Sequence, residues 1–198
     1  MTEKQEHILI GMILGDAYLQ KTGSKNARIR LEHGFIQREY LAWKVGQFSE
    51  FFSTKLSTLQ RYNPVFGKTY TYVRAQSYAS EEFGKFRTLF YSLSGVKTLP
   101  ENFVEFFTKP SSLAVWFMDD GYYYKRDRIA YIYLPNYDEV SFRKLLEALS
   151  SNFSLFPRLK KKSKGWCLVF TVKETDELVR IIKPYIIKCM EYKLGKDS

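Results

Sequence analysis

Two acidic residues, Asp16 and Asp120, stand at the ends of similar apolar segments. Residues 9–17 read LIGMILGDA and residues 113–121 read LAVWFMDDG, and aligning Asp16 with Asp120 brings their apolar positions into register. If both segments are helices, each carboxylate faces the negative end of a helix dipole, which carries about half an elementary charge. A cation relieves that repulsion, and hard divalent cations prefer oxygen ligands of this kind.

Paired carboxylates that hold Mg²⁺ beside a basic surface are suited to phosphodiester hydrolysis. The metal activates a water molecule and stabilises the leaving oxygen. Carbonyl groups at the helix ends, such as that of Gly15, provide further hard ligands. Asp119 is either a buried hydrogen-bonded acid or a contributor outside the inner ligand shell. The alternative is a pair of core helices with acids at their solvent ends, and the matching register of the two segments argues against it.

The charge of the chain points to a polyanionic partner. The 198 residues carry a formal net charge of +10, which favours nucleic acid ahead of a membrane surface. The alternative is a basic protein whose charge serves solubility alone. With 45% hydrophobic and 17% aromatic residues, the chain can bury a sizeable core, so disorder is not expected.

Targeting and redox signals are sparse. The charged N-terminal residues lack the apolar core of a signal peptide, and no apolar run is long enough to span a membrane, so we expect an intracellular protein. Cys167 and Cys189 have no zinc-ligand spacing and lie among apolar residues, so we expect buried, inert thiols.

The two segments fall at equivalent places in a repeated order of elements. Apolar periodicity, caps and turn residues predict a helix over 4–15, capped by Thr2 or Glu3, and later a second apolar helix over 113–120, capped by Ser111 and Ser112. The other predicted elements are strands at 17–20 and 27–33, a helix at 35–52, strands at 56–62 and 68–78, a helix at 80–93, a short helix from Pro100, a hairpin at 122–134, a helix at 138–153 capped by Asp138, a hairpin at 158–172 turning at 162–165, and a helix at 174–190 broken or kinked at Pro184.

Helix, hairpin, helix, hairpin and helix thus occur twice, with Asp16 and Asp120 separated by 104 positions. A repeat of this length indicates a duplicated half-domain and not a solenoid. We therefore predict an α+β fold with pseudo-symmetric half-domains at 1–107 and 108–198. The two apolar helices would pair about a pseudo-two-fold axis.

If the polyanionic partner is DNA, its recognition needs polar side chains that share one sheet face. Arginine and glutamine read guanine and adenine edges in the major groove, whereas lysines mostly contact phosphates. The alternative for a run of charges is a solvated face. For Tyr122, Tyr123 and Tyr124 we expect packing in preference to DNA contact. The strand faces and their turns nominate as DNA-binding residues Arg28, Arg30, Glu32, Arg61, Tyr72, Arg74, Gln76, Lys125, Arg128, Arg158, Lys160 and Lys162, with Lys161 and Lys164 in the same basic run.

Several motifs together resemble the LAGLIDADG homing endonucleases, in particular the single-chain, two-motif, intron-encoded members. Residues 13–18 read ILGDAY and residues 116–121 read WFMDDG, as the subgroup writes its two motifs. A KTLP segment at 97–100 precedes the second motif, and KPY at 183–185 and YKL at 192–194 match its C-terminal elements. The resemblance covers nearly the whole chain.

The resemblance implies two αββαββα half-domains whose antiparallel sheets form a saddle over double-stranded DNA, with the motif helices packed at the centre. It implies a monomer that cuts both strands of a long, specific site with Mg²⁺, for which Mn²⁺ can substitute. Asp16 and Asp120 would be the catalytic, metal-binding acids, and Lys97 and Lys193 the basic residues near the active centre. Each lysine could instead be an ordinary exposed charge.

One departure from the family pattern concerns helix packing. The family keeps small residues at motif positions three and seven, and the first segment has Gly11 and Gly15 there, but the second has Val115 and Asp119. We therefore expect asymmetric packing in which the glycines receive the larger partners.

Other functions stay open on the sequence alone. An RNA maturase that assists splicing of its own intron RNA would have the same fold, and a non-catalytic DNA-binding protein would share the basic surface. Retention of both acids favours the endonuclease. The resemblance also suggests an organelle, a mitochondrion or chloroplast, as the location.

Overall fold

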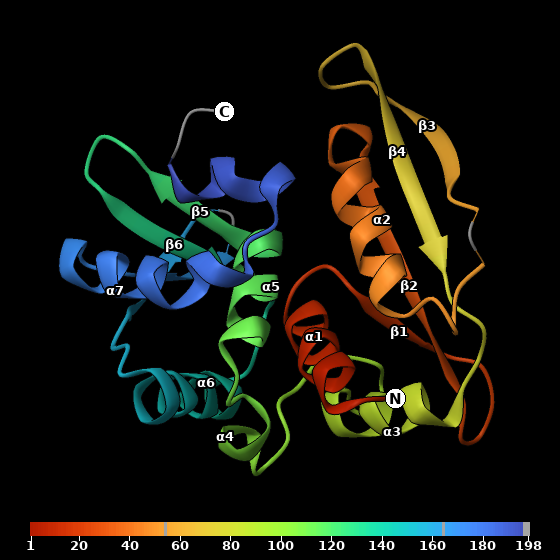
Figure 1. The fold of residues 1–198 in the computed structure, drawn as a ribbon, viewed down its shortest axis with the longest axis horizontal. Helices are drawn as coiled ribbons and strands as arrows, with labels where there is room; N and C mark the ends of the chain where they lie inside the picture. The colour runs from red at the N-terminus through yellow and green to blue at the C-terminus, as the bar shows by residue number, and fades with distance from the viewer. Residues whose placement is uncertain (54, 164, 196–198) are drawn as a thin grey trace. The chain divides into compact units, whose positions relative to one another are not determined.

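The computed structural model describes residues 1–53, 55–163 and 165–195 (Figure 1). Its chain forms two compact units, one of Met1–Gly15 together with the chain from Thr88 onward, and the other of Asp16–Arg87. The fold is α+β, with two four-stranded sheets in which every strand pair is antiparallel. Within the described residues, no helix combines the length and apolar character that crossing a bilayer requires.

The predicted repeat is present. Its first copy runs α1 (Glu3–Leu14), β1 (Tyr18–Lys21), β2 (Ala27–Gly34), α2 (Arg38–Gln47), β3 (Ser57–Asn63), β4 (Lys68–Gln76) and α3 (Glu81–Phe90). Its second copy runs α5 (Pro110–Asp120), β5 (Gly121–Tyr124), β6 (Ile129–Tyr133), α6 (Glu139–Phe153), β7 (Arg158–Lys162), β8 (Gly165–Val169) and α7 (Val172–Ile182). The αββαββα order is confirmed, and the boundaries at 1–107 and 108–198 stay a prediction.

The remaining elements are short. They are a 3-10 turn η1 (Phe35–Gln37), a helix α4 (Phe103–Phe106), and the 3-10 segments η2 (Lys183–Tyr185) and η3 (Lys188–Leu194).

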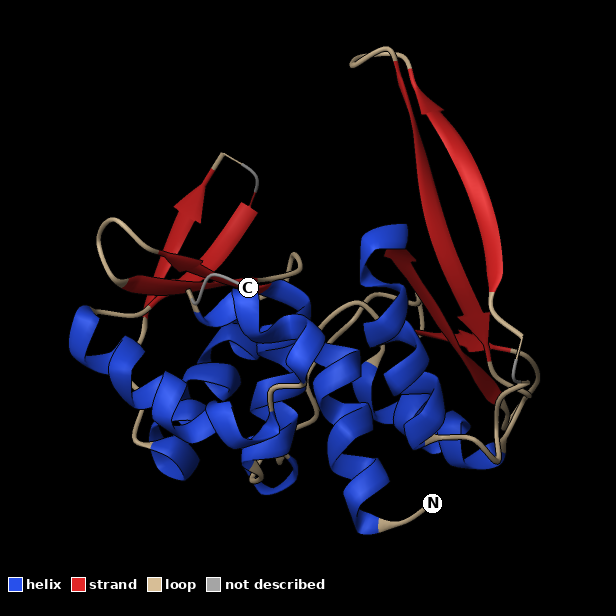
Figure 2. Ribbon diagram, turned by 45° about the horizontal axis from the view of Figure 1, so that its top comes forward, coloured by secondary structure: helices blue, strands red, loops and turns tan. Residues whose placement is uncertain are grey.

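The two sheets have the same topology. Their strand orders are β1-β2-β4-β3 and β5-β6-β8-β7, so the first hairpin of each repeat supplies one edge strand and the inner strand next to it. The strands of both sheets are drawn in red in Figure 2. Apolar and polar side chains alternate along β2, with Ile29 and Leu31 buried and Arg30 exposed. Helix α2 packs on β2 and β4, on the face that carries the apolar side chains.

The bounds of two helices differ from the prediction. The helix predicted at 35–52 is a 3-10 turn followed by α2, which ends at Gln47, because Gly46 weakens its last turn. The helix predicted from Pro100 begins at Phe103 instead. The break predicted at Pro184 is confirmed, because α7 ends at Ile182 and Pro184 lacks the N–H that would continue the helix.

The start of the second motif helix also differs from the prediction. Ser111 and Ser112 lie inside α5, which begins at Pro110 with Lys109 in the cap position. Proline suits the first helical position because its fixed φ is already helical and its missing N–H costs no bond there. Ser112 is thereby free to serve the packing of α5, as described below.

Neither cysteine forms a disulfide. The prediction of a buried thiol is confirmed for Cys167 and is wrong for Cys189, which is half-buried. Burial raises the pKa of the Cys167 thiol above its ordinary value, which keeps it protonated and unreactive.

Candidate metal centre and nucleic-acid interface

The two motif helices, α1 and α5, pack directly against each other within one compact unit (Figure 1). Gly11 makes this approach possible, because a Cβ there would meet the Ser112 carbonyl oxygen and would lie 2.8 Å from Val115 Cβ. The Ser112 hydroxyl donates a hydrogen bond to the His7 carbonyl across the same seam, at 2.7 Å. A β-carbon on Gly15 would likewise collide with the side chain of Asp119.

The expected asymmetric packing is therefore confirmed. Gly11 receives Val115 and Gly15 receives Asp119, so each glycine of α1 faces one of the larger residues of α5. Because Gly11 pairs near the start of α5 and Gly15 pairs at its last turn, the C-terminal ends of the helices lie together. Asp16 follows Gly15 directly in the chain, and Asp120 is the last residue of α5.

Lys97 and Lys193 each bind the end of one motif helix. Lys97 Nζ donates to the Gly15 carbonyl at 2.6 Å. Lys193 Nζ donates to the carbonyls of Asp119 at 3.0 Å and Gly121 at 2.9 Å. Both side chains are half-buried, and both satisfy carbonyls that a helix leaves without an internal partner. They are not ordinary solvated charges.

Asp120 has a buried tyrosine in its neighbourhood. Tyr137, in the loop before α6, is 7% exposed. Burial, reinforced by the charges of Asp120 and Tyr91, raises the pKa of the Tyr137 phenol above its ordinary value, so it stays protonated. Asp119 and Asp120 are themselves half-buried. Nothing in the spacing of Tyr137 marks it in the sequence.

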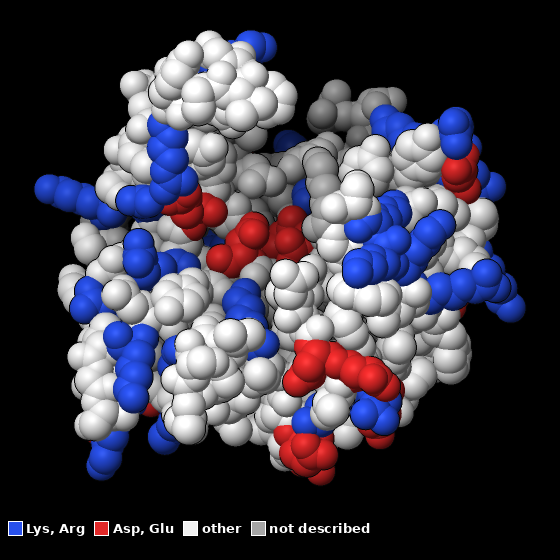
Figure 3. Space-filling model, turned by 180° about the vertical axis from the view of Figure 1, so that it is seen from behind, with Lys and Arg blue, Asp and Glu red and all other residues white. Residues whose placement is uncertain are grey.

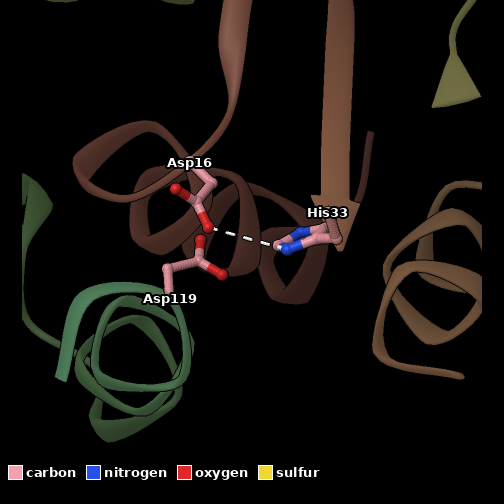
Figure 4. Close-up of side chains that lie close together, drawn as sticks. All are labelled: Asp16, His33 and Asp119. Carbon is pink, nitrogen blue, oxygen red and sulfur yellow. Dashed lines mark ion pairs between the residues drawn. The ribbon is translucent and has the colours of Figure 1, made fainter. Parts of the chain in front are cut away.

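Asp16 belongs to the other unit, where its neighbour is His33 of β2. Asp16 Oδ2 lies 3.6 Å from His33 Nδ1 (Figure 4). The Asp16 side chain is 42% exposed, whereas that of His33 is 2% exposed. The same figure labels Asp119 on the last turn of α5. Asp16 thus has one edge toward solvent and one toward a buried imidazole.

A buried lysine lies behind His33. Lys44 of α2 is 0% exposed, and its Nζ lies 3.1 Å from His33 Nε2. The other ring nitrogen, Nδ1, lies 3.2 Å from Gln37 Oε1. In the sequence, Lys44 stands between Trp43 and Val45, among the apolar positions of α2. A lysine within an apolar stripe was the available signal.

The seven DNA-binding residues predicted in the first repeat share one face of their sheet. The register pairs Arg30 with Gln76 and Glu32 with Arg74 across β2 and β4, and Arg61 with Tyr70 across β3 and β4. Part of this face is hollowed, and the lining of the hollow includes Asp16. The seven residues are Arg28, Arg30, Glu32, Arg61, Tyr72, Arg74 and Gln76.

Glu32 organises the arginines of this face. It accepts two hydrogen bonds from Arg61, at 2.5 and 3.0 Å, and another from Arg74 Nε. Desolvation acts to raise the pKa of Glu32, but the hydrogen bonds from the two arginines outweigh it and lower that pKa overall. The Arg61 guanidinium also stacks 5.0 Å from the centre of the Tyr72 ring. The face therefore presents oriented guanidinium groups.

The sheet of the second repeat presents basic and aromatic side chains together. Arg158, Lys160 and Lys162 alternate along β7, and Lys162 Nζ lies 3.5 Å from the centre of the Tyr131 ring. On the surface drawn in Figure 3, Lys and Arg side chains are widely spread, and some lie directly against acidic ones.

Not every nominated residue lies on a strand. Lys125 and Arg128 lie in the turn between β5 and β6. Arg128 Nη2 lies 3.6 Å from Asp176 Oδ2. Lys164 is outside the described residues. Of the three tyrosines expected to pack, Tyr123 meets Gly195, whereas Tyr122 is 49% exposed.

Residues 6–178 match the LAGLIDADG DNA endonuclease family. The chain belongs to this family. It is 27% identical, over 98% of its length and 85% of the relative's, to a probable intron-encoded endonuclease 1 of Wickerhamomyces canadensis.

Other curated relatives are larger. A RecA protein of Mycobacterium gastri is 30% identical over 98% of this chain, and the chain spans only 48% of that relative. A cytochrome b mRNA maturase bI2 of Debaryomyces hansenii is 26% identical over 95% of this chain and 72% of the relative.

Two solved structures share the LAGLIDADG fold. The homing endonuclease I-WcaI bound to its DNA recognition sequence is 25% identical, covers 100% of this chain and 88% of its own, and has a TM-score of 0.90. The structure of I-DmoI in complex with DNA and Mn is 13% identical, with a TM-score of 0.52, over 91% of this chain and 96% of its own. That likeness shows the fold alone.

Proposed function

We propose that this LAGLIDADG protein is a monomeric, site-specific endonuclease that makes an Mg²⁺-dependent double-strand cut in a long DNA target. The observation that carries the proposal is the seam of α1 and α5, which brings the C-terminal ends of two buried helices together. Asp16 follows the C-cap of α1, and Asp120 is the last residue of α5. The name and DNA complex of the structural relative I-WcaI support the same activity.

Asp16 and Asp120 are proposed to hold the metal, with the Gly15 carbonyl and Asp119 as further oxygen donors. The donor set fits Mg²⁺ or Mn²⁺, because carboxylates and carbonyls are hard ligands and both acids are at least partly accessible. When bound, the metal would lower the pKa of a water molecule and stabilise the leaving oxygen.

The chain's own residues have separate parts in this proposal. Lys97 and Lys193 neutralise the dipole ends of the motif helices through their carbonyl contacts, so that two carboxylates can gather there. The arginines and Gln76 on the first sheet would read base edges, and the lysines of β7 would bind phosphates.

The test begins with a target selected from a randomised DNA library by cleavage. A supercoiled plasmid that carries the selected site should become linear with Mg²⁺ and remain intact with EDTA. Accumulation of nicked circles alone would contradict the double-strand cut. Binding of the selected site without any cutting would favour a non-catalytic DNA-binding protein.

A second candidate function is supported by the relatives that are named cytochrome b mRNA maturases. A maturase would bind its own intron RNA and accelerate its splicing. In vitro splicing of the host intron, with and without the protein, tests this role separately from cleavage. An organelle is the proposed location, in line with these relatives and with the intron-encoded endonuclease.

A further inference from the structure

Lys44 and His33 form a buried polar pair behind Asp16. Lys44 is 0% exposed and His33 is 4% exposed, so both are withdrawn from water. Lys44 Nζ also lies 4.4 Å from the centre of the Tyr40 ring, whose face attracts a cation. Burying an ammonium group is costly unless it is compensated by such partners. A methionine or leucine at this core position of α2 would avoid the free-energy cost of burying a charge. Packing alone therefore does not explain the lysine.

The hydrogen-bonding capacities of the partners determine where the imidazole proton lies. An ammonium group has only donors, so Lys44 Nζ, 3.1 Å from His33 Nε2, requires a lone pair on that nitrogen. A neutral imidazole with a lone pair on Nε2 carries its proton on Nδ1.

The contacts of the other ring nitrogen, Nδ1, independently indicate the same tautomer of His33. Nδ1 faces two acceptor oxygens, Gln37 Oε1 at 3.2 Å and Asp16 Oδ2 at 3.6 Å. A lone pair on Nδ1 would repel both oxygens, whereas an N–H attracts both. The donor on one side of His33 and the acceptors on the other therefore select one tautomer.

We infer that Lys44 and His33 are positioning residues for Asp16. Lys44 fixes His33 as the Nδ1–H tautomer, whose N–H is hydrogen-bonded to Gln37 Oε1 and lies 3.6 Å from Asp16 Oδ2, so His33 does not act as a metal ligand. The polarised N–H restrains the carboxylate on its buried side and leaves its exposed side for the metal. This inference rests on the proposed function, because it assigns the orientation of a proposed metal-binding acid.

The first experiment reads the tautomer directly. Long-range ¹H–¹⁵N NMR distinguishes protonated from unprotonated ring nitrogens, and His7→Gln assigns the spectrum because the chain has 2 histidines. We expect a protonated Nδ1 and an unprotonated Nε2 in His33 of the unmodified protein, before and after addition of Mg²⁺. A protonated Nε2, or loss of the Nδ1 proton on addition of Mg²⁺, would overturn the inference.

Lys44→Met then removes the donor but keeps an unbranched side chain in the cavity. We expect His33 to lose its single tautomer in this variant, seen as exchange-averaged ring nitrogens. Arg38→Met is the matched control, since it removes an exposed cation from the same helix and should leave the His33 spectrum unchanged. An unaltered His33 spectrum in Lys44→Met would contradict the role of the lysine.

A mutant cycle separates positioning from packing. Lys44→Met should lower the cleavage rate roughly 10- to 100-fold, as loss of a supporting contact behind a metal ligand typically does, with metal-free target binding unchanged. His33→Asn places an amide N–H near the position of Nδ1 and should retain most activity, because asparagine needs no tautomer to be fixed. In the His33→Asn background, Lys44→Met should then have little further effect on the rate.

Equal losses from Lys44→Met in both backgrounds would mean that the lysine only supports packing. If the unmodified protein does not cut DNA at all, the proposed endonuclease function fails. The NMR result on DNA-free protein still decides whether Lys44 fixes the tautomer of His33.

Discussion

At the scale of residues, the contacts of Lys97 and Lys193 give two positions of the sequence a defined physical task. Each ammonium group binds carbonyls at the C-terminal end of a motif helix, where the helix dipole is negative. The sequence left open whether each lysine lies in the active centre or is an ordinary surface charge. The contacts in the folded chain decide between these two roles. The same holds for Lys44, His33 and Tyr137, whose roles depend on neighbours distant in the chain.

Lys193→Met should lower the free energy of unfolding by about 1–3 kcal/mol, the usual contribution of hydrogen bonds to a charged group. It leaves the carbonyls of Asp119 and Gly121 without their lysine donor. Urea unfolding measures the difference. Lys85→Met, at an exposed position of α3, is the control and should change stability by less than about 0.5 kcal/mol.

At the scale of elements, the motif helices are positioned by glycine. Gly11 and Gly15 were recognisable in the sequence as small residues at motif positions three and seven. Alignment of the two motifs places Val115 and Asp119 at the same positions of the second segment. Helix ends were predicted less well, because several neighbouring residues can each occupy the first positions of a helix. Pro110 took the first turn of α5, and Ser112 was left to bond to α1.

Gly11→Ala should destabilise the protein by about 1–3 kcal/mol, the typical cost of overpacking. Its β-carbon would collide with the Ser112 carbonyl. Gly46→Ala is the matched control within helix α2, because a β-carbon there meets nothing within 4 Å. It should leave stability unchanged or raise it by about 1 kcal/mol. Equal effects of the two substitutions on denaturant midpoints would contradict the close approach of α1 and α5.

The N-cap of α6 makes stability depend on pH. Hydrogen bonds from Ser141 lower the pKa of Asp138, so its contribution is present above the unfolded pKa of about 3.9 and is lost as pH falls through the folded pKa. Asp138→Ala should cost about 1 kcal/mol at pH 7 and less below pH 3. Asp138→Asn keeps the cap without the titration. A pH-independent difference between Asp138→Ala and the unmodified protein would contradict this account.

At the scale of the whole molecule, the net charge of +10 and the duplicated αββαββα order were both available from the sequence. Periodicity and turn residues located both hairpins of each repeat, and alternation indicated the two faces of β2 and β4, because it is a strong local signal. The hairpin expected to turn around residues 125–127 does so, which leaves Lys125 in the turn, and the turn extends to Arg128. Arg128 has φ 55 there.

The basic surface predicts how DNA affinity responds to salt. Removing one phosphate contact with Lys160→Ala should weaken binding to all sequences and reduce the slope of log affinity against log salt by about 1. Gln76→Ala should instead alter base preference at one position of the target with little change in slope. Fluorescence anisotropy across a salt series measures both, and a sequence-dependent loss in Lys160→Ala would contradict its assignment to phosphate.

In the proposed endonuclease, Asp16 and Asp120 bind the metal on which DNA cleavage depends. The most direct measurement is cleavage of a plasmid carrying the selected target by the unmodified protein, Asp16→Asn and Asp120→Asn, with Mg²⁺ present and target binding measured in parallel. We expect linear product from the unmodified protein and none from either variant, while all three bind the target with similar affinity. Undiminished cutting by either variant would contradict the claim.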